Sequence, residues 1–254
     1  MPDTSQSQHT IAGTVLTMPV RVRQAQQHTA MFAVDADAAQ QMIDYSGLQV
    51  RRIKSGKAVV VLMLMHYIDT DLGQYYEYGT NVMVRDGSGP MAAFVHHLPV
   101  DQAFTLEAGR SIWGYPKVMA DFQIREGRRG QNRPASAEQK DAARRTGRFG
   151  FDVTHDDKLI IDMEFAPGLP IPSVLTSREQ VYPTYSYLDG VLRRTEGVTR
   201  LSGVRYRIGG VRVQLGDHPY ADELRAIGLP KRAFMSGSAA NVDMTFGDAQ
   251  EISH

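Results

Sequence analysis

The chain contains no cysteine, which excludes disulfide bonds, thiol nucleophiles and zinc sites built on thiolates. It also lacks a net charge, because 28 Lys and Arg residues balance 28 Asp and Glu residues. This balance gives no electrostatic reason to expect a nucleic-acid or anionic-membrane partner. The N-terminal residues are polar, and the longest apolar run, residues 58–65, is far too short to cross a bilayer. We therefore expect a cytoplasmic protein that binds neither nucleic acid nor membrane.

The composition itself is that of an ordinary globular protein, with 42% hydrophobic and 22% charged residues among 254. This length is sufficient for one large β-rich domain with a sizeable core. Neither an internal repeat nor a linker is evident, so we expect a single domain over residues 1–254, with residues 1–10 flexible. Residues 125–148 lack apolar periodicity, which predicts a solvated excursion.

Most of the chain shows patterns typical of antiparallel strands. Residues 58–68 are continuously apolar, as in a strand buried on both faces. Residues 74–86 and 90–100 predict a hairpin, because the DGSG turn at 86–89 between them is rich in glycine. Further predictions are a hairpin over 149–165 turning at 155–158, a hairpin over 204–215 around Gly209 and Gly210, and a last strand over 241–247.

Two segments predict helices. Residues 35–43 combine helix-favouring Ala, Gln and Met with an Asp that can cap the start. Residues 217–230 begin with Asp and Pro and end at Gly228 and Pro230. We therefore expect an α+β fold that is mainly antiparallel β, barrel-like, with a few peripheral helices.

The stretch GRSIWGYPKVMADF, residues 109–122, places Lys117 at the start of a strand that alternates apolar and more polar residues. An isolated lysine is usually exposed. The only tryptophan, Trp113, precedes Lys117 together with Tyr115, and Tyr75 lies on another predicted strand beside Glu77. An apolar pocket disfavours the charged form of a lysine, and a neutral amine can attack a carbonyl to form a Schiff base.

The segment GRSIWGYPK closely resembles the signature of the acetoacetate decarboxylase superfamily, in which a Gly-Arg pair precedes an aromatic residue, a proline and the Schiff-base lysine. The resemblance implies that Lys117 is this lysine. LGQYYEYG, residues 72–79, resembles the segment that carries an active-site glutamate, which corresponds to Glu77. Weaker likeness extends through residues 182–194. The resemblance implies a barrel-like double-sheet acetoacetate decarboxylase-like fold and a homo-oligomer, and it implies no cofactor.

The chain departs from the decarboxylase pattern at three positions. Val118 stands where decarboxylases have a second lysine, Val61 where they have a second acidic residue, and Gln27 where they have an arginine. Arg21 and Arg23 lie near Gln27 in the sequence and are candidates to replace that arginine in space. Because neighbours on a strand point to opposite faces, Val118 would not share a pocket with Lys117. The departures therefore concern the substrate more than the covalent chemistry.

The resemblance implies a lyase in which Lys117 condenses with a small oxo acid, the expected partner. The main expectation is decarboxylation of a 3-oxo acid such as acetoacetate to a ketone and carbon dioxide. The alternative is an aldolase-dehydratase that condenses pyruvate with an aldehyde. Glu77 would move protons, and Trp113, Tyr115 and Tyr75 would line the substrate site, although aromatic side chains are as often core packing. A second alternative is a barrel that binds a small ligand without catalysis.

A metal site is not expected from the histidines. His66, His96, His97 and His218 are the candidates, but their spacing matches no known motif. His96 and His97 are adjacent in a predicted strand, so their side chains are expected to point to opposite faces.

Overall fold

The computed structural model describes residues 7–53, 56–86, 91–126, 148–176 and 178–252. The helices are α1 (Ala36–Ile43), α2 (Ala103–Trp113), α4 (Ser173–Thr176) and α5 (Pro219–Ala226), with a 3-10 turn η1 (Asp44–Ser46). The strands in the first half of the chain are β1 (Gln8–Ile11), β2 (Thr14–Thr17), β3 (Val20–Asp35), β4 (Arg52–Ile53), β5 (Lys57–Thr70), β6 (Tyr75–Val84), β7 (Ala92–Val100), β8 (Lys117–Met119) and β9 (Asp121–Glu126). The later strands are β10 (Phe149–His155), β11 (Lys158–Phe165), β12 (Leu169–Pro170), β13 (Gln180–Leu188), β14 (Val191–Ser202), β15 (Arg205–Ile208), β16 (Val211–Leu215), β17 (Met235–Phe246) and β18 (Gln250–Ile252).

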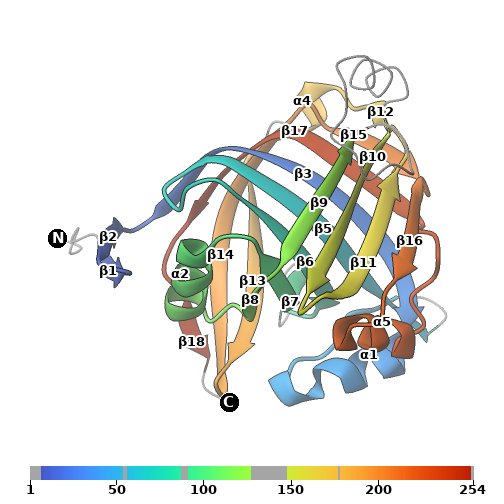
Figure 1. Ribbon diagram of the computed structural model, residues 1–254, viewed down its shortest axis with the longest axis horizontal. Coiled ribbons are helices and arrows are strands. Elements are labelled where there is room, and N and C mark those ends of the chain that lie inside the picture. Colours follow the sequence, from blue (N-terminus) through green and yellow to red (C-terminus); the bar gives the residue numbers. More distant parts are fainter. Residues whose placement is uncertain (1–6, 54–55, 87–90, 127–147, 177, 253–254) are drawn as a thin grey trace.

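Seven strands of the large sheet close into a barrel (Figure 1). They pair in the order β17, β3, β5, β6, β7, β13 and β14, and β14 returns to pair with β17. Neighbours in this ring are antiparallel except β7 and β13, which are parallel. The expectation of a mainly antiparallel, barrel-like fold is therefore confirmed.

A second sheet of four strands, in the order β16, β11, β10 and β9, packs against the outside of the barrel (Figure 1). Strand β5 shows how the two sides of the barrel wall differ. Leu62 and Leu64 join a core cluster with Phe151 of the small sheet, whereas Met65 and Tyr67 belong to a second cluster that includes residues of α2. Alternate side chains of β5 thus fill two separate cores, which confirms that this strand is buried on both faces.

Strand β7 contains a β-bulge that changes which side chains face the barrel interior. Thr80 of β6 pairs with His97 whereas Asn81 pairs with Val95, so His96 is an extra residue on β7. A bulge of this kind reverses the alternation of side chains along the strand. Phe94 accordingly belongs to the outer core cluster, the one that contains Phe151 of the small sheet. Val100 belongs to the inner core cluster, the one that contains residues of α2, although both positions are even-numbered.

Two helices agree with the sequence, whereas α2 and the short α4 were not predicted. Helix α1 has Asp35 as its N-cap, as expected. Helix α5 lies within the predicted segment 217–230, and its N-cap is His218, with Pro219 at the first helical position. Helix α2, which was not predicted, begins after Gln102, whose side chain accepts a hydrogen bond from the Thr105 amide.

Other strand predictions fared differently. The hairpin over 149–165 is confirmed, because β10 and β11 pair around the positive-φ residues Asp156 and Asp157. The hairpin over 204–215 is wrong: β15 pairs with β12 and β17 in the large sheet, whereas β16 pairs with β11 in the small one. Gly209 and Gly210 have φ of 65° and 82°, so this turn passes the chain between two sheets.

The remaining expectations concern the two ends of the chain and two segments that lie partly outside the described residues. The predicted last strand is longer than expected, beginning at Met235, and β18 follows it. Residues 8–10, which were expected to be flexible, lie in β1. In the predicted excursion 125–148, residues 125–126 end β9, and 127–147 lie outside the described residues, as does most of the turn 86–89.

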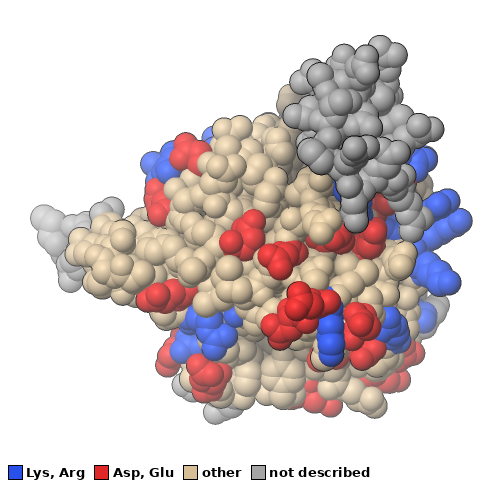
Figure 2. Space-filling model, in the orientation of Figure 1, with Lys and Arg blue, Asp and Glu red and all other residues tan. Residues whose placement is uncertain are grey.

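The surface is consistent with the balanced charge of the sequence. Figure 2 shows Asp and Glu side chains interspersed with Lys and Arg on the face viewed, so neither sign dominates that face. Among the described residues, no helix is long and apolar enough to cross a membrane.

Candidate active site

Lys117 ends in a buried cluster of polar groups, and its side chain is only 3% exposed. Its Nζ atom lies 2.8 Å from Oε2 of Glu77, whose side chain is 7% exposed. The same nitrogen donates a 2.8 Å hydrogen bond to Oγ1 of Thr105 and lies 5.1 Å from the centre of the Tyr75 ring. The amine thus has an acid–base partner, a hydroxyl and an aromatic wall within a site largely shielded from water.

The strand order places Lys117 and Glu77 on one face. Strand β8 pairs with β7 in parallel, with Lys117 opposite Leu98, and β6 pairs with β7 on its other side, with Glu77 opposite Val100. Leu98 and Val100 are two residues apart and point to the same face. Lys117 and Glu77 therefore approach each other across β7, on the face of the sheet that lines the barrel interior. The bulge in β7 determines which side chains of that strand point to this face.

The signature segment positions the lysine through the end of α2. Gly114, with a φ of 62°, is the left-handed cap that ends the helix. The chain then turns through Tyr115, whose carbonyl accepts a 2.8 Å hydrogen bond from the Lys117 amide, and Arg110 donates a 3.2 Å hydrogen bond to the Lys117 carbonyl. A Cβ on Gly109 would lie 2.6 Å from both Cδ and Cε of Lys117. Only glycine at position 109 leaves room for the lysine against α2.

Two tyrosines enclose the carboxyl group of Glu77. The hydroxyl of Tyr67 donates a 3.0 Å hydrogen bond to Oε1 of Glu77, and the Tyr67 and Tyr75 rings stack with centres 4.3 Å apart. Burial, reinforced by the nearby Glu77 charge, raises the pKa of both tyrosines well above the usual value. Tyr67 therefore remains protonated and acts as a hydrogen-bond donor that orients Glu77.

The other two predicted lining residues form their hydrogen bonds with groups other than the amine. The Tyr115 hydroxyl is 3.1 Å from Oγ1 of Thr184, and burial raises the pKa of Tyr115 to about 12. The Trp113 indole donates a 2.8 Å hydrogen bond to the carbonyl of Gly247 and packs edge-on to Phe246. Of the three predicted aromatic residues, the structure places Tyr75 beside the amine, Tyr115 nearby, and Trp113 where it anchors α2 to the end of β17.

The positions that depart from the decarboxylase pattern have other surroundings. Gln27 donates a 3.0 Å hydrogen bond to Sδ of Met63. Arg23 forms surface ion pairs at 2.8 Å with Asp69 and 2.6 Å with Asp71, and Arg21 is also exposed. Neither of these two candidate arginines is among the contacts of the Lys117 amine in the described part of the chain.

Thr105 and Tyr67 contact the predicted pair but were not identified from the sequence. Thr105 is one helical turn before Gly109, so both lie on the face of α2 that meets Lys117. This spacing is informative only once α2 is known to be a helix. Tyr67 pairs with Tyr75 across β5 and β6, and Glu77 is two residues farther along the same face. That relation depends on the register of the two strands.

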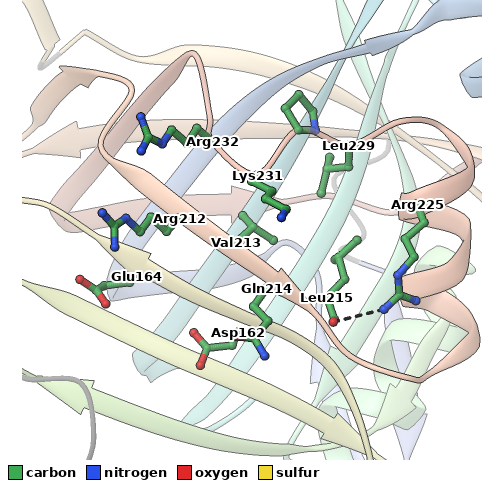
Figure 3. Close-up of a pocket in the computed structure, with 11 residues that line it drawn as sticks. Asp162, Glu164, Arg212, Val213, Gln214, Leu215, Arg225, Leu229, Lys231 and Arg232 are labelled. Carbon is green, nitrogen blue, oxygen red and sulfur yellow. Dashed lines mark hydrogen bonds between the residues drawn. The ribbon is translucent and has the colours of Figure 1, made fainter.

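An open pocket of about 610 Å³ lies elsewhere, between the small sheet and the segment after α5 (Figure 3). Asp162, Glu164, Arg212, Lys231 and Arg232 are among the residues that line it. None of the predicted site residues belongs to this lining. Lys231 is exposed, in contrast to the buried Lys117.

Comparisons with known proteins identify the family and the fold of the chain. The family model for acetoacetate decarboxylase (ADC) matches residues 2–253. No curated protein matched the chain in sequence. One similar solved structure is an acetoacetate decarboxylase with 16% identity and a TM-score of 0.62, covering 92% of this chain and 89% of that chain. Another, acetoacetate decarboxylase from Legionella pneumophila, has 17% identity and a TM-score of 0.62, with coverage of 92% and 87%.

A third similar structure has a name that indicates different chemistry. It is the enduracididine biosynthesis enzyme MppR, complexed with the condensation product of pyruvate and imidazole 4-carboxaldehyde. Its identity is 18% and its TM-score 0.60, with 92% of this chain and 89% of that chain covered. At these identities the structural matches establish the shared fold.

Proposed function

The chain belongs to the acetoacetate decarboxylase family, which supports a lyase-type enzyme, and from this premise we propose that Lys117 forms a Schiff base with a small oxo acid. The observation that carries the proposal is the buried contact of 2.8 Å between the Lys117 amine and Glu77. Two opposite charges are costly to bury, and transfer of the amine proton to Glu77 replaces both with neutral groups. The neutral amine is the form that attacks a carbonyl.

For a 3-oxo acid, Glu77 provides the proton that the dehydration step needs. The amine adds to the ketone carbon, and Glu77 in its acid form protonates the resulting hydroxyl, which leaves as water and yields an iminium. The bond to the carboxylate breaks, its electron pair moves toward the iminium nitrogen, and carbon dioxide leaves an enamine. Protonation of the enamine carbon and hydrolysis release the ketone and the free amine. The apolar walls disfavour the charged carboxylate, which favours its loss as neutral carbon dioxide.

A second candidate is condensation of pyruvate with an aldehyde followed by loss of water. The observation that favours it is that Val61 and Gln27 replace the acidic residue and arginine of the decarboxylase pattern, while the Glu77 and Tyr67 pair remains. In this reaction Glu77 takes a methyl proton from the pyruvate iminium, and the enamine carbon attacks the aldehyde. Glu77 would then return this proton to the new alkoxide, take the second proton from the former methyl carbon, and pass it to the hydroxyl, which leaves as water.

The covalent step is tested by reductive trapping. Borohydride is added in the presence of acetoacetate or of pyruvate, and tryptic peptides are analysed by mass. We expect an irreversible adduct on the peptide that contains Lys117. The Lys117→Met variant should form none, and Lys231→Met, which removes an exposed lysine, should trap like the wild type. If the wild-type protein gave no adduct with any oxo acid tried, the proposal would be wrong.

The two reactions are separated by their products. Carbon dioxide released from acetoacetate, with a ketone formed in equal amount, supports decarboxylation. Consumption of pyruvate only when an aldehyde is present supports condensation. Full turnover by Lys117→Met in both assays would refute the role of Lys117 in either reaction.

A further inference from the structure

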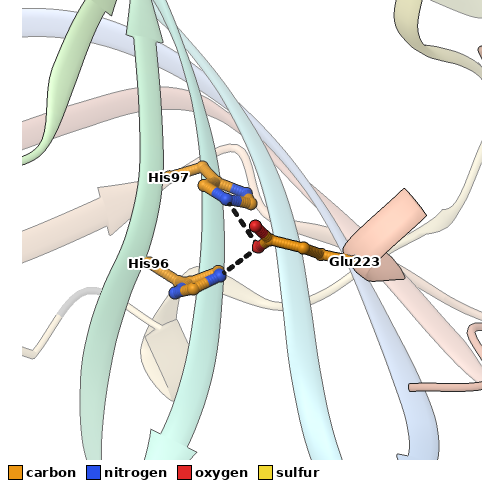
Figure 4. Close-up of side chains that lie close together, drawn as sticks. All are labelled: His96, His97 and Glu223. Atoms are coloured by element: carbon orange, nitrogen blue, oxygen red, sulfur yellow. Dashed lines mark hydrogen bonds and ion pairs between the residues drawn. The ribbon is translucent and has the colours of Figure 1, made fainter. Parts of the chain in front are cut away.

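A second cluster of ionisable side chains lies outside the barrel, between β7 and α5. His96 and His97 come from the bulge in β7, and Glu223 comes from α5 (Figure 4). One nitrogen of each ring approaches the same carboxylate oxygen, Oε2, at 2.6 Å for His96 and 3.0 Å for His97. The donor atoms of the three residues all lie within 4.8 Å of one another.

The bulge explains why two adjacent histidines face one way. In a regular strand they would point to opposite faces, which is the expectation from the sequence, and that expectation is wrong here. His96 is 7% exposed and His97 is 5% exposed, so both rings are removed from water on the same side of β7. A two-residue repeat alone could not have predicted this convergence.

Both rings are held in place from behind. Nδ1 of His96 lies 2.9 Å from the hydroxyl of Tyr45, and the His97 ring stacks on Tyr220 with centres 3.6 Å apart. When Nε2 of His96 binds a metal, its Nδ1 carries the proton and donates it to Tyr45. Such a hydrogen bond on the second nitrogen is the usual support of a metal-binding histidine.

The two nitrogens of His97 have different surroundings. Nδ1 is buried and has no partner among the described residues, whereas Nε2 faces Glu223. Both rings thus present Nε2 to one carboxylate oxygen, and this convergence of two imidazole nitrogens and a carboxylate is the observation that points to a shared ligand. The Glu223 side chain is 42% exposed and Tyr45 is 50% exposed, so an ion can enter from the solvent side.

We propose that His96, His97 and Glu223 bind one divalent transition-metal ion of the zinc type, which ties α5 to the barrel. Two imidazoles and one carboxylate form a ligand set that suits Zn²⁺ and leaves a fourth position for water. At Zn–ligand distances of about 2.0–2.1 Å, tetrahedral donor atoms are about 3.3 Å apart. The two contacts of Glu223, at 2.6 and 3.0 Å, are shorter than this spacing, and rotation of the partly exposed Glu223 side chain can lengthen them.

The site is separate from the proposed chemistry, because the two histidines lie on the outer face of β7 and Lys117 on the inner face. The ion is thus expected to stabilise the fold without entering the reaction. Metal binding should raise the melting temperature of the wild type in proportion to the logarithm of free metal concentration. It should leave trapping at Lys117 unchanged.

The test uses the full-length protein after removal of metals with a chelator. Zn²⁺ binding is measured by calorimetry, and Co²⁺ binding by its visible absorption, in the wild type and in Glu223→Gln and His96→Gln. The matched control is Asp222→Asn, which changes the adjacent residue of α5, an exposed partner of Arg225. Circular dichroism checks that each variant is folded.

We expect one ion per chain in the wild type and in Asp222→Asn, and at least tenfold weaker binding in both ligand variants. Co²⁺ bound to the wild type should show the intense visible bands of a tetrahedral site. Absence of stoichiometric binding to the wild type would overturn the proposal. Equal affinity in a folded Glu223→Gln or His96→Gln would also overturn it, because the ion would then bind elsewhere.

Discussion

The tight contact between Gly109 and Lys117 makes Gly109→Ala the most informative substitution in the proposed active site. The new methyl carbon would lie 2.6 Å from Cδ and Cε of Lys117 and 3.2 Å from its Nζ. Non-bonded carbon atoms normally approach to about 3.5–4.0 Å, so the lysine has to retreat by roughly 1 Å. Its hydrogen bond to Thr105 and its contact with Glu77, both 2.8 Å, cannot both survive such a shift.

The expected effect on reactivity is much larger than the effect on stability. A displacement of about 1 Å at a reacting group can lower the rate about 100-fold, which corresponds to about 2.7 kcal/mol in the barrier. Crowding of a packed site costs about 1–3 kcal/mol of folding free energy, but alanine gains about 1 kcal/mol over glycine inside a helix. The free energy of unfolding should therefore fall by no more than about 2 kcal/mol.

The assay is the rate of borohydride trapping at Lys117 with acetoacetate or pyruvate, measured beside urea unfolding of the same preparations. Gly247→Ala is the matched control, because nothing lies within 4 Å of a Cβ at position 247. It should trap within about twofold of the wild type, as is usual for substitutions without new contacts. If Gly109→Ala also trapped at the wild-type rate while remaining folded, the buried position of the lysine would not be the reacting one.

Three further predictions concern residues around the proposed site and the outer core. Thr105→Val removes the hydroxyl that accepts a hydrogen bond from the amine and should slow trapping about tenfold, whereas Thr105→Ser should retain the wild-type rate. Equal trapping rates in the two variants would refute the role of the hydroxyl. Tyr67→Phe removes the hydroxyl that donates to Glu77 and should reduce the trapping rate about tenfold without changing the fold. An unchanged trapping rate would show that this hydrogen bond does not orient the carboxyl group. Burial lowers the pKa of His28 to about 4, against a usual value of 6.5, so the unfolded chain binds more protons between these values and stability falls as the pH drops through this window. Because the ring is partly exposed, the wild type should lose about 1–2 kcal/mol more than His28→Phe between pH 7 and pH 5 in urea unfolding, and parallel losses in both proteins would contradict this.

Much of the fold and part of the site followed from local patterns. The continuous apolar run of β5 predicted a strand buried on both faces, and the Asp35 cap predicted α1. The spacing of Gly109, Tyr115 and Lys117 identified the candidate lysine through its resemblance to a family signature. Each of these features is encoded within about fifteen residues of sequence, where propensity, periodicity and capping act directly.

The remaining features depended on contacts between distant segments. Tyr67 reaches Glu77 because of the register between β5 and β6, and Thr105 reaches the amine because α2 lies against β8. The extra residue at His96 reverses the side-chain alternation in β7, so it decides both the interior position of Val100 and the convergence of two histidines on α5. The sequence by itself determined several of the strands, the start of α1 and which lysine to examine. Only the closed barrel decided what surrounds that lysine, because strand pairing and bulges arise from interactions across the whole sheet.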